Sequence, residues 1–210
     1  MQVDPFQNAA CRIWDLFPVH LFFSVHQDIA NLISTSPTLQ QPARLLDIGS
    51  STGRLATLLT GRGYHLFRLD QNQTLLAALR EKTHKNANSD AQPLANNTFD
   101  AALCCFVLHT LCEPDRLAVL DLAFRVTPVL IVADYCLTER NLHYPGGLLA
   151  LMLERCIGRP HYRGYTTFMR QGGLRGLLHR ISGESWFEIR DEIPLYGGVG
   201  TALVLCSKSG

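Results

Sequence analysis

The sequence is poor in charged residues, and those it has are balanced in sign. Charged residues make up 18% of the 210 residues and hydrophobic residues 47%. A composition this apolar excludes an intrinsically disordered chain. The 19 Lys and Arg residues against 18 Asp and Glu leave a formal net charge of +1. We therefore expect no nucleic-acid partner, because nucleic-acid-binding domains usually carry a strongly basic face.

Features of several other protein classes are also missing. No apolar run approaches the ~20 residues of a membrane-spanning helix, and the first residues carry no basic signal segment. The seven cysteines are odd in number, form no CxxC pair, and mostly lie in apolar runs, where free cysteine acts as a small hydrophobe. We expect a cytoplasmic globular protein with no transmembrane segment and no bound metal. The sequence leaves the oligomeric state open.

Short apolar runs alternate with amphipathic segments along the chain. Before the first run, apolar residues recur every three or four positions over 6–17 and 22–33, which predicts two helices. The runs that we interpret as buried strands cover 44–48, 64–69, 99–108 and 126–134, and the helices predicted between them cover 55–59, 72–79 and 115–124. Strands buried on both faces and alternating with helices predict a doubly wound, mostly parallel α/β sheet.

The end of the chain departs from this alternation. Segments 185–193 and 201–207 flank turn-rich residues, which predicts a terminal antiparallel strand pair. We expect a single domain over 1–210. Its predicted parts are a helical cap over 1–42, a cofactor-binding core over 43–134, a lid or acceptor segment over 135–184 and the terminal strand pair over 185–210.

A glycine-containing loop follows the first strand. Its small residues would let a ligand approach the backbone closely, and the helix predicted to start near Thr52 would point free N–H groups at that ligand. A dinucleotide site needs G-x-G-x-x-G, which Gly49, Ser51 and Gly53 do not form. Asp47 in the strand would repel phosphate but suits a ligand with a cationic amine. A dinucleotide oxidoreductase is therefore the less favoured alternative.

The stretch Leu45-Leu46-Asp47-Ile48-Gly49, followed by Ser51 and Gly53, resembles the class I S-adenosylmethionine-dependent methyltransferases, with Ser51 in place of the middle glycine. The resemblance covers about residues 40–135. It implies S-adenosyl-L-methionine as cofactor and S-adenosyl-L-homocysteine as product. The implied fold is a Rossmann-like, seven-stranded sheet in the order 3-2-1-4-5-7-6, with its third strand near 87–90, N-terminal cap helices and a lid after strand five.

The same resemblance assigns the cofactor-binding residues. Asp70, before Gln71, matches the acid that accepts hydrogen bonds from both ribose hydroxyls. Asp90-Ala91 matches the pair near the adenine, and Cys105 would pack against the methionine portion. The full predicted set is Asp47, Gly49, Ser51, Gly53, Asp70, Gln71, Asp90, Ala91 and Cys105.

The run from Cys104 to Leu111 is similar to the hydrophobic-Leu-His-His-Leu stretch of the small-molecule branch, which includes quinone-biosynthesis methyltransferases. It places His109 at the carboxyl end of a central strand, where open α/β sheets bind ligands. His109 is the candidate general base for an acceptor that must lose a proton. A buried structural histidine is the alternative.

Residues 141–183 contain six arginines and one acid, Glu154. Guanidinium groups bind carboxylate or phosphate through paired donors, which favours an anionic acceptor. A solvated helical face is the alternative. The candidate substrate residues are Tyr135, His143, Arg159, His161, Arg163 and Tyr165.

Together these features predict S-adenosylmethionine-dependent methyl transfer to a small, anionic acceptor molecule. A catalytically inactive, adenosylmethionine-binding partner subunit is the main alternative. Turnover with a labelled methyl donor separates these two, and binding of S-adenosylhomocysteine against NAD separates both from an oxidoreductase.

Overall fold

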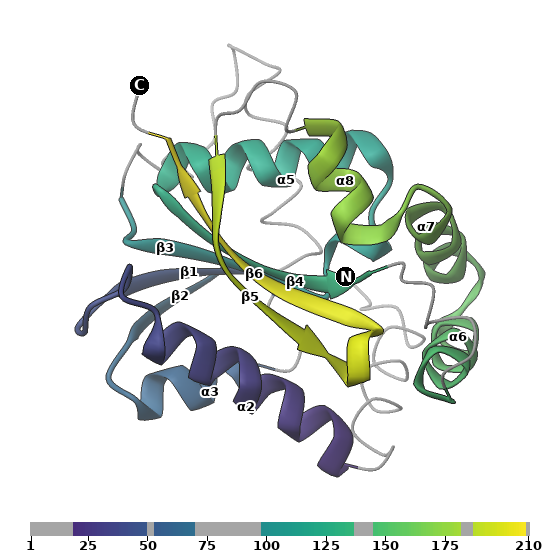
Figure 1. The fold of residues 1–210 in the computed structure, drawn as a ribbon, viewed down its shortest axis with the longest axis horizontal. Helices are drawn as coiled ribbons and strands as arrows, with labels where there is room; N and C mark the ends of the chain where they lie inside the picture. Colours follow the sequence, from purple (N-terminus) through teal and green to yellow (C-terminus); the bar gives the residue numbers. More distant parts are fainter. Residues whose placement is uncertain (1–18, 50–52, 70–97, 137–144, 182–186, 209–210) are drawn as a thin grey trace, which may run out of the picture.

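The computed structural model describes residues 19–49, 53–69, 98–136, 145–181 and 187–208 (Figure 1). The helices are α2 (Val19–Thr35), α3 (Arg54–Gly61), α5 (Glu113–Val126), α6 (Pro145–Ile157), α7 (Arg159–Arg170) and α8 (Gly173–Ile181). The strands are β1 (Arg44–Ile48), β2 (His65–Leu69), β3 (Ala101–Cys105), β4 (Val129–Tyr135), β5 (Phe187–Leu195) and β6 (Gly200–Ser207). Two short 3-10 turns are η1 (Leu108–Thr110) and η4 (Tyr196–Gly198). No described helix has the length and apolar character needed to cross a membrane.

The six described strands form one mixed sheet in the order β2-β1-β3-β4-β6-β5. Strand β1 pairs in parallel with β2 and β3, and β3 pairs in parallel with β4. Strand β6 runs antiparallel to both β4 and β5. The predicted α/β sheet and the terminal antiparallel pair are therefore confirmed. The helices predicted over 6–17 and 72–79, and the strand predicted near 87–90, lie outside the described residues.

Helices cover both faces of the sheet. In Figure 1, α2 and α3 lie on one face and α5 and α8 on the other. Neighbouring strand residues enter opposite cores: Leu45 packs with residues of α2 and α3, whereas Leu46 packs with residues of α5 and α8. Because both faces are covered, β1 reads as a continuous apolar run rather than an alternating one.

Two predicted strands are longer than the observed ones. The strand predicted over 99–108 ends at Cys105, because Phe106 has a φ of 55°, in the left-handed region that an extended strand cannot use. The chain then forms η1, so His109 lies in a turn beyond the strand. The strand predicted over 126–134 begins at Val129 because α5 continues to Val126. The Val129 N–H then donates to the Thr127 hydroxyl at 3.1 Å.

The carboxyl ends of β1, β3 and β4 meet at one edge of the sheet, as they must in a parallel arrangement. Helix α7 packs on η1 at this edge. A Cβ atom on Gly164 would lie 2.9 Å from the carbonyl oxygens of both His109 and Thr110. The close approach of α7 to η1 therefore requires glycine at this position.

We expect Gly164→Ala to destabilise the protein, although alanine favours a helix over glycine by roughly 1 kcal/mol. The added methyl group must push two backbone oxygens away, and overpacking of this kind costs about 1–3 kcal/mol. Urea unfolding measures the change. Gly61→Ala in α3 is the matched control, since its Cβ would meet no atom within 4 Å. A gain in stability at Gly164 equal to that at Gly61 would contradict the packing described here.

Candidate active site

The loop after β1 has the geometry expected of a ligand-binding turn. Asp47 is buried near the carboxyl end of β1, between Arg68 of β2 and Leu103 of β3 in the sheet. Gly49 and Gly53 adopt φ values of 76° and 72°, which glycine takes without strain. Gly53 is the N-cap residue of α3, and the first backbone N–H groups of a helix point out of its N-terminus, where they can bind a polar group. The role of these residues in holding the cofactor stays a prediction.

Five of the predicted cofactor residues, namely Ser51, Asp70, Gln71, Asp90 and Ala91, lie outside the described residues, so their roles stay predictions. Cys105 is half-buried at the end of β3, whereas Cys104 is fully buried. Burial raises the pKa of the Cys105 thiol far above its ordinary value. A thiol held neutral in this way suits the predicted packing role rather than a nucleophilic one.

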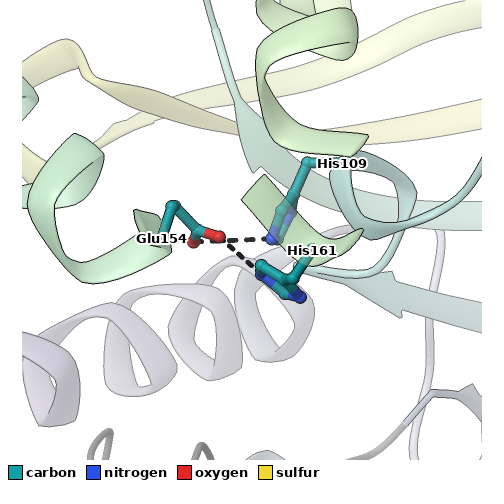
Figure 2. Close-up of side chains that lie close together, drawn as sticks. All are labelled: His109, Glu154 and His161. Atoms are coloured by element: carbon teal, nitrogen blue, oxygen red, sulfur yellow. Dashed lines mark ion pairs between the residues drawn. The ribbon is translucent and has the colours of Figure 1, made fainter. Parts of the chain in front are cut away.

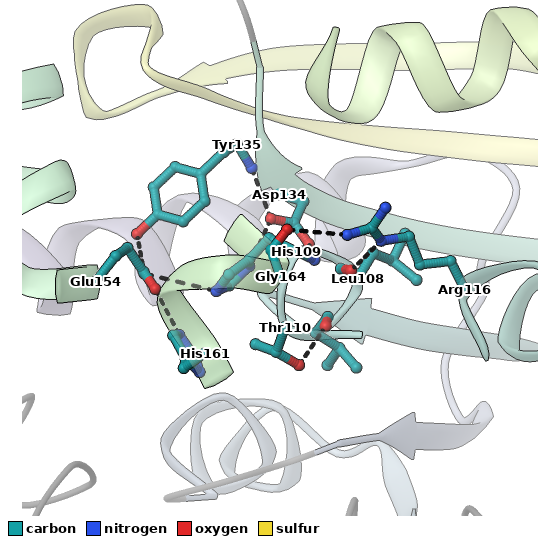
Figure 3. A network of polar contacts seen from close by, with 10 residues as sticks. Leu108, His109, Thr110, Arg116, Asp134, Tyr135, Glu154, His161 and Gly164 are labelled. Carbon is teal, nitrogen blue, oxygen red and sulfur yellow. Dashed lines mark hydrogen bonds and ion pairs between the residues drawn. The ribbon is translucent and has the colours of Figure 1, made fainter. Parts of the chain in front are cut away.

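A polar cluster forms at the same edge of the sheet (Figure 3). It consists of His109 from η1, Asp134 and Tyr135 from β4, Glu154 from α6 and His161 from α7. Asp134 fixes one side of it: its Oδ1 lies 2.8 Å from His109 Nδ1 and accepts the Tyr135 N–H at 2.8 Å. Its Oδ2 accepts the His109 backbone N–H at 3.2 Å. Because a carboxylate only accepts, His109 carries a proton on Nδ1 in this contact.

Glu154 lies on the other side of His109 and is fully buried (Figure 2). Its Oε1 accepts the Tyr135 hydroxyl at 2.8 Å and lies 3.5 Å from His109 Nε2. Its Oε2 lies 2.5 Å from His161 Nε2. The Tyr165 ring closes the cluster, with its edge against His109 and Tyr135. His161 is partly exposed, so the cluster opens on that side.

The charges of the cluster support one another. Burial alone would lower the pKa of His109, but the carboxylates of Asp134 and Glu154 outweigh it and raise that pKa. Burial alone would raise the pKa of Glu154, and the two histidines with the Tyr135 hydroxyl lower it instead. The pKa of Tyr135 is raised by burial and by the Glu154 charge. The cluster therefore holds two carboxylates beside groups that can supply positive charge.

Arg116 positions the elements that carry the cluster. It is 1% exposed, and its Nε donates to the Leu108 carbonyl at 2.8 Å. One terminal nitrogen donates to the Gly164 carbonyl at 3.0 Å and the other to the Gln171 side chain at 3.1 Å. Its guanidinium also lies over the Phe168 ring. One side chain of α5 thus joins η1 to α7.

The structure brings together several, but not all, of the predicted acceptor residues. Tyr135, His161 and Tyr165 lie in or against the cluster with His109. Arg159 and Arg163 are exposed on α7, so their predicted role in binding the acceptor stays a prediction, and His143 lies outside the described residues. Sequence reasoning did not assign Asp134, Glu154 or Arg116. The one available signal was Glu154, the single acid in an arginine-rich segment.

The chain is similar to known proteins at two levels. Residues 46–128 match the family model described as a methyltransferase domain. Similar solved structures include the PH0226 protein of Pyrococcus horikoshii, with 12% identity and a TM-score of 0.58 over 94% of this chain and 99% of that one. No curated protein sequence matches the chain.

Two further solved structures carry methyltransferase descriptions. A SAM-dependent methyltransferase of Aquifex aeolicus shares 15% identity and a TM-score of 0.53 over 99% of this chain and 100% of that one. An O-methyltransferase family protein of Burkholderia thailandensis shares 15% identity and a TM-score of 0.59 over 99% of this chain. This chain spans 60% of the Burkholderia protein. At these identities the structures establish a shared fold.

We expect Arg116→Lys to lower the free energy of unfolding, because one ammonium cannot replace three directed donors. A hydrogen bond from a charged donor contributes about 1.5–3 kcal/mol, and at least one of the three that Arg116 makes is lost. Arg190→Lys, on an exposed side chain of β5, is the control and should change stability by less than about 0.5 kcal/mol. Urea unfolding of both variants measures the difference. Equal stability of the two variants would show that Arg116 does not join η1 to α7.

Proposed function

We propose that this chain methylates a small molecule bound at the polar cluster, with S-adenosylmethionine as the methyl donor. The match of residues 46–128 to the methyltransferase-domain family model supports this proposal. The methyltransferase descriptions of the family model and of the similar solved structures favour this donor over the dinucleotide alternative. The acceptor position is proposed because the glycine loop and the polar cluster lie at the same edge of the sheet. The glycine loop follows β1 there, and the cluster follows β3 and β4, so donor and acceptor would meet where open α/β sheets bind ligands.

The chain's residues have a limited task in this reaction. S-adenosylmethionine supplies a methyl group already activated by its sulfonium, so the protein aligns the reactants and excludes water. We assign Asp47 to the cationic amine of the cofactor and the first turn of α3 to its polar groups. The predicted roles of Asp70 at the ribose and Asp90 near the adenine complete this part of the proposal. The finer fold features, a seventh strand near 87–90 and a lid formed by α6 and α7, belong to it as well.

The cluster is proposed to receive the acceptor. Its open side, at His161, is the only part of the cluster with an exposed surface among the residues described for it, so an acceptor would enter there. His109 lies behind that opening and is the proposed catalytic residue. Asp134 is a positioning residue, since it acts by orienting His109. The exposed guanidinium groups of Arg159 and Arg163 on the same helix support an anionic acceptor.

Asp47→Asn tests the cofactor position. Removing the charge that faces the amine should weaken S-adenosylhomocysteine binding by about 1–3 kcal/mol, the usual contribution of a hydrogen bond to a charged group. Isothermal titration calorimetry on the folded variant measures this. Asp100→Asn, at the opposite end of the sheet beside the start of β3, is the control and should bind normally. Unchanged affinity in the Asp47 variant would remove the loop from the cofactor site.

A labelled methyl donor tests the activity and the acceptor position together. The chain is incubated with methyl-labelled S-adenosylmethionine and a small-molecule cell extract, and the labelled product is isolated. His109→Ala should then lower the rate of its formation by roughly 100-fold, within the usual range for loss of a group that assists proton transfer, while S-adenosylhomocysteine affinity is retained. His65→Ala, on exposed β2, should leave the rate unchanged. Normal specific activity of the His109 variant would support a purely structural histidine.

A further inference from the structure

We infer that His109, Glu154 and His161 form a binding site for one divalent transition-metal ion, with zinc as the best-fitting member of the class. Each residue offers one ligand atom, and the three atoms all lie within 4.8 Å of one another. The residues come from η1, α6 and α7, which converge at the carboxyl edge of the sheet (Figure 2). They share no spacing motif in the sequence, which is why the absence of CxxC pairs led us to expect no metal.

The separations fit a common ion. Two imidazoles that bind one zinc ion at about 2.0–2.1 Å with a near-tetrahedral angle have ring centres roughly 5 Å apart. The His109 and His161 centroids are 5.3 Å apart, with the rings inclined at 79°. His109 Nε2 lies 3.5 Å from Glu154 Oε1, close to the roughly 3.3 Å expected of two ligands on such an ion. The 2.5 Å contact of His161 with Glu154 Oε2 is shorter, so a small rotation of the carboxylate would accompany binding.

Two buried atoms of the cluster, Glu154 Oε2 and His161 Nε2, face each other at 2.5 Å as an ion pair that lacks the alignment of a hydrogen bond. Native proteins contain few buried polar atoms without an aligned hydrogen bond. Both atoms belong to side chains that commonly bind zinc. One ion would bind both atoms after the carboxylate has rotated, since two ligands of a zinc ion lie roughly 3.3 Å apart.

The surrounding contacts orient the proposed ligands. The Asp134 carboxylate holds a proton of His109 on Nδ1, so Nε2, which faces Glu154, is the nitrogen available to a metal ion. The Tyr135 hydroxyl donates to Glu154 Oε1 at 2.8 Å. Carboxylate–histidine–metal arrangements of this kind fix the ring and raise its basicity. His109 Nε2 and the buried Glu154 carboxylate need a positive charge between them. Either a bound metal ion or a second proton on His109 can provide it.

The types of ligand atom in the proposed site indicate which class of metal ion it would bind. Two imidazole nitrogens and one carboxylate suit zinc and neighbouring transition metals, whereas magnesium and calcium prefer oxygen ligands alone. Three protein ligands leave one position of a tetrahedral ion open, as in catalytic zinc sites. The partly exposed side chain of His161 lies at the opening of the cluster, which places the open position where an acceptor would enter.

The consequence for the reaction rests on the proposed function. An ion at the open side would bind an acceptor hydroxyl or thiol and lower its pKa. The acceptor would release its proton to solvent, and its electron pair would form the new bond to the methyl carbon. The carbon–sulfur bond of the sulfonium would break with its electrons remaining on sulfur, giving S-adenosylhomocysteine. With the ion bound, His109 would assist loss of the acceptor proton by holding the ion and would not accept the proton itself.

Metal titration of the intact chain tests the site without requiring turnover. Protein dialysed against a chelator is titrated with zinc chloride by calorimetry, and with cobalt chloride by absorption spectroscopy. We expect one ion per chain and the d–d bands of four- or five-coordinate cobalt. His161→Ala should weaken binding by at least 100-fold, and Asp134→Asn by about 10–100-fold, as for other residues that orient a ligand. His65→Ala is the control and should bind as the unchanged protein does.

The outcomes separate this inference from the proposed function. Zinc binding that is absent, or that survives both His161→Ala and Glu154→Gln, overturns the metal site. Since Glu154 is fully buried, the Glu154→Gln variant is first checked for folding. If that variant does not fold, the test rests on His161→Ala, because His161 is partly exposed. Full-rate methyl transfer by metal-free protein would overturn the role of the ion in the reaction while leaving the proposed function intact. Stoichiometric zinc binding without transfer of labelled methyl to any metabolite supports the metal site and contradicts the proposed function.

Discussion

Two carboxylates, Asp134 and Glu154, are completely buried at one edge of the sheet, and the surrounding structure depends on keeping them neutralised. An unpaired charge in a protein interior costs several kcal/mol. Asp134 is held by two backbone N–H groups and the His109 imidazole, and Glu154 by a tyrosine hydroxyl and two imidazoles, one of which is again that of His109. The carboxylates and their partners come from η1, β4, α6 and α7, so the cluster joins all four elements.

The packing of α7 follows from the same requirement. His161 reaches Glu154 because α7 lies directly on η1, and Gly164 permits that distance. This close contact buries the carbonyl groups of Leu108 and Gly164 next to each other. Arg116 of α5 donates a charged hydrogen bond to each of them and so joins the two elements. The close packing of α7 on η1 is therefore needed to bring His161 into the cluster.

The fold could be predicted where a strand is buried on both faces of the sheet, because such a strand appears in the sequence as a continuous run of apolar residues. Leu45 and Leu46 enter opposite cores, so the run around them marks β1 directly. The end of β3 could not be predicted, because nothing in the residue type of Phe106 signals its positive φ. The terminal strand pair was predictable because turn residues separate two apolar segments.

The candidate site was predictable only in part, because a sequence shows which residues are available but not which ones converge. His109, Tyr135, His161 and Tyr165 were identified from their residue types and segments. Their contact with Glu154 depends on how α6 and α7 fold back onto η1, which no spacing encodes. The arginines of the same segment were identified by charge alone, and helix packing leaves Arg159 and Arg163 exposed.

The central claim is that the cofactor loop and the polar cluster form one site. A crystal structure of the chain with S-adenosylhomocysteine bound tests it most directly, because the thioether sulfur marks where the transferred methyl group was attached. We expect Asp47 and the first turn of α3 to hold the ligand and its sulfur to face the opening of the cluster at His161. A sulfur directed away from His109 and His161, or separated from them by α7, would contradict it.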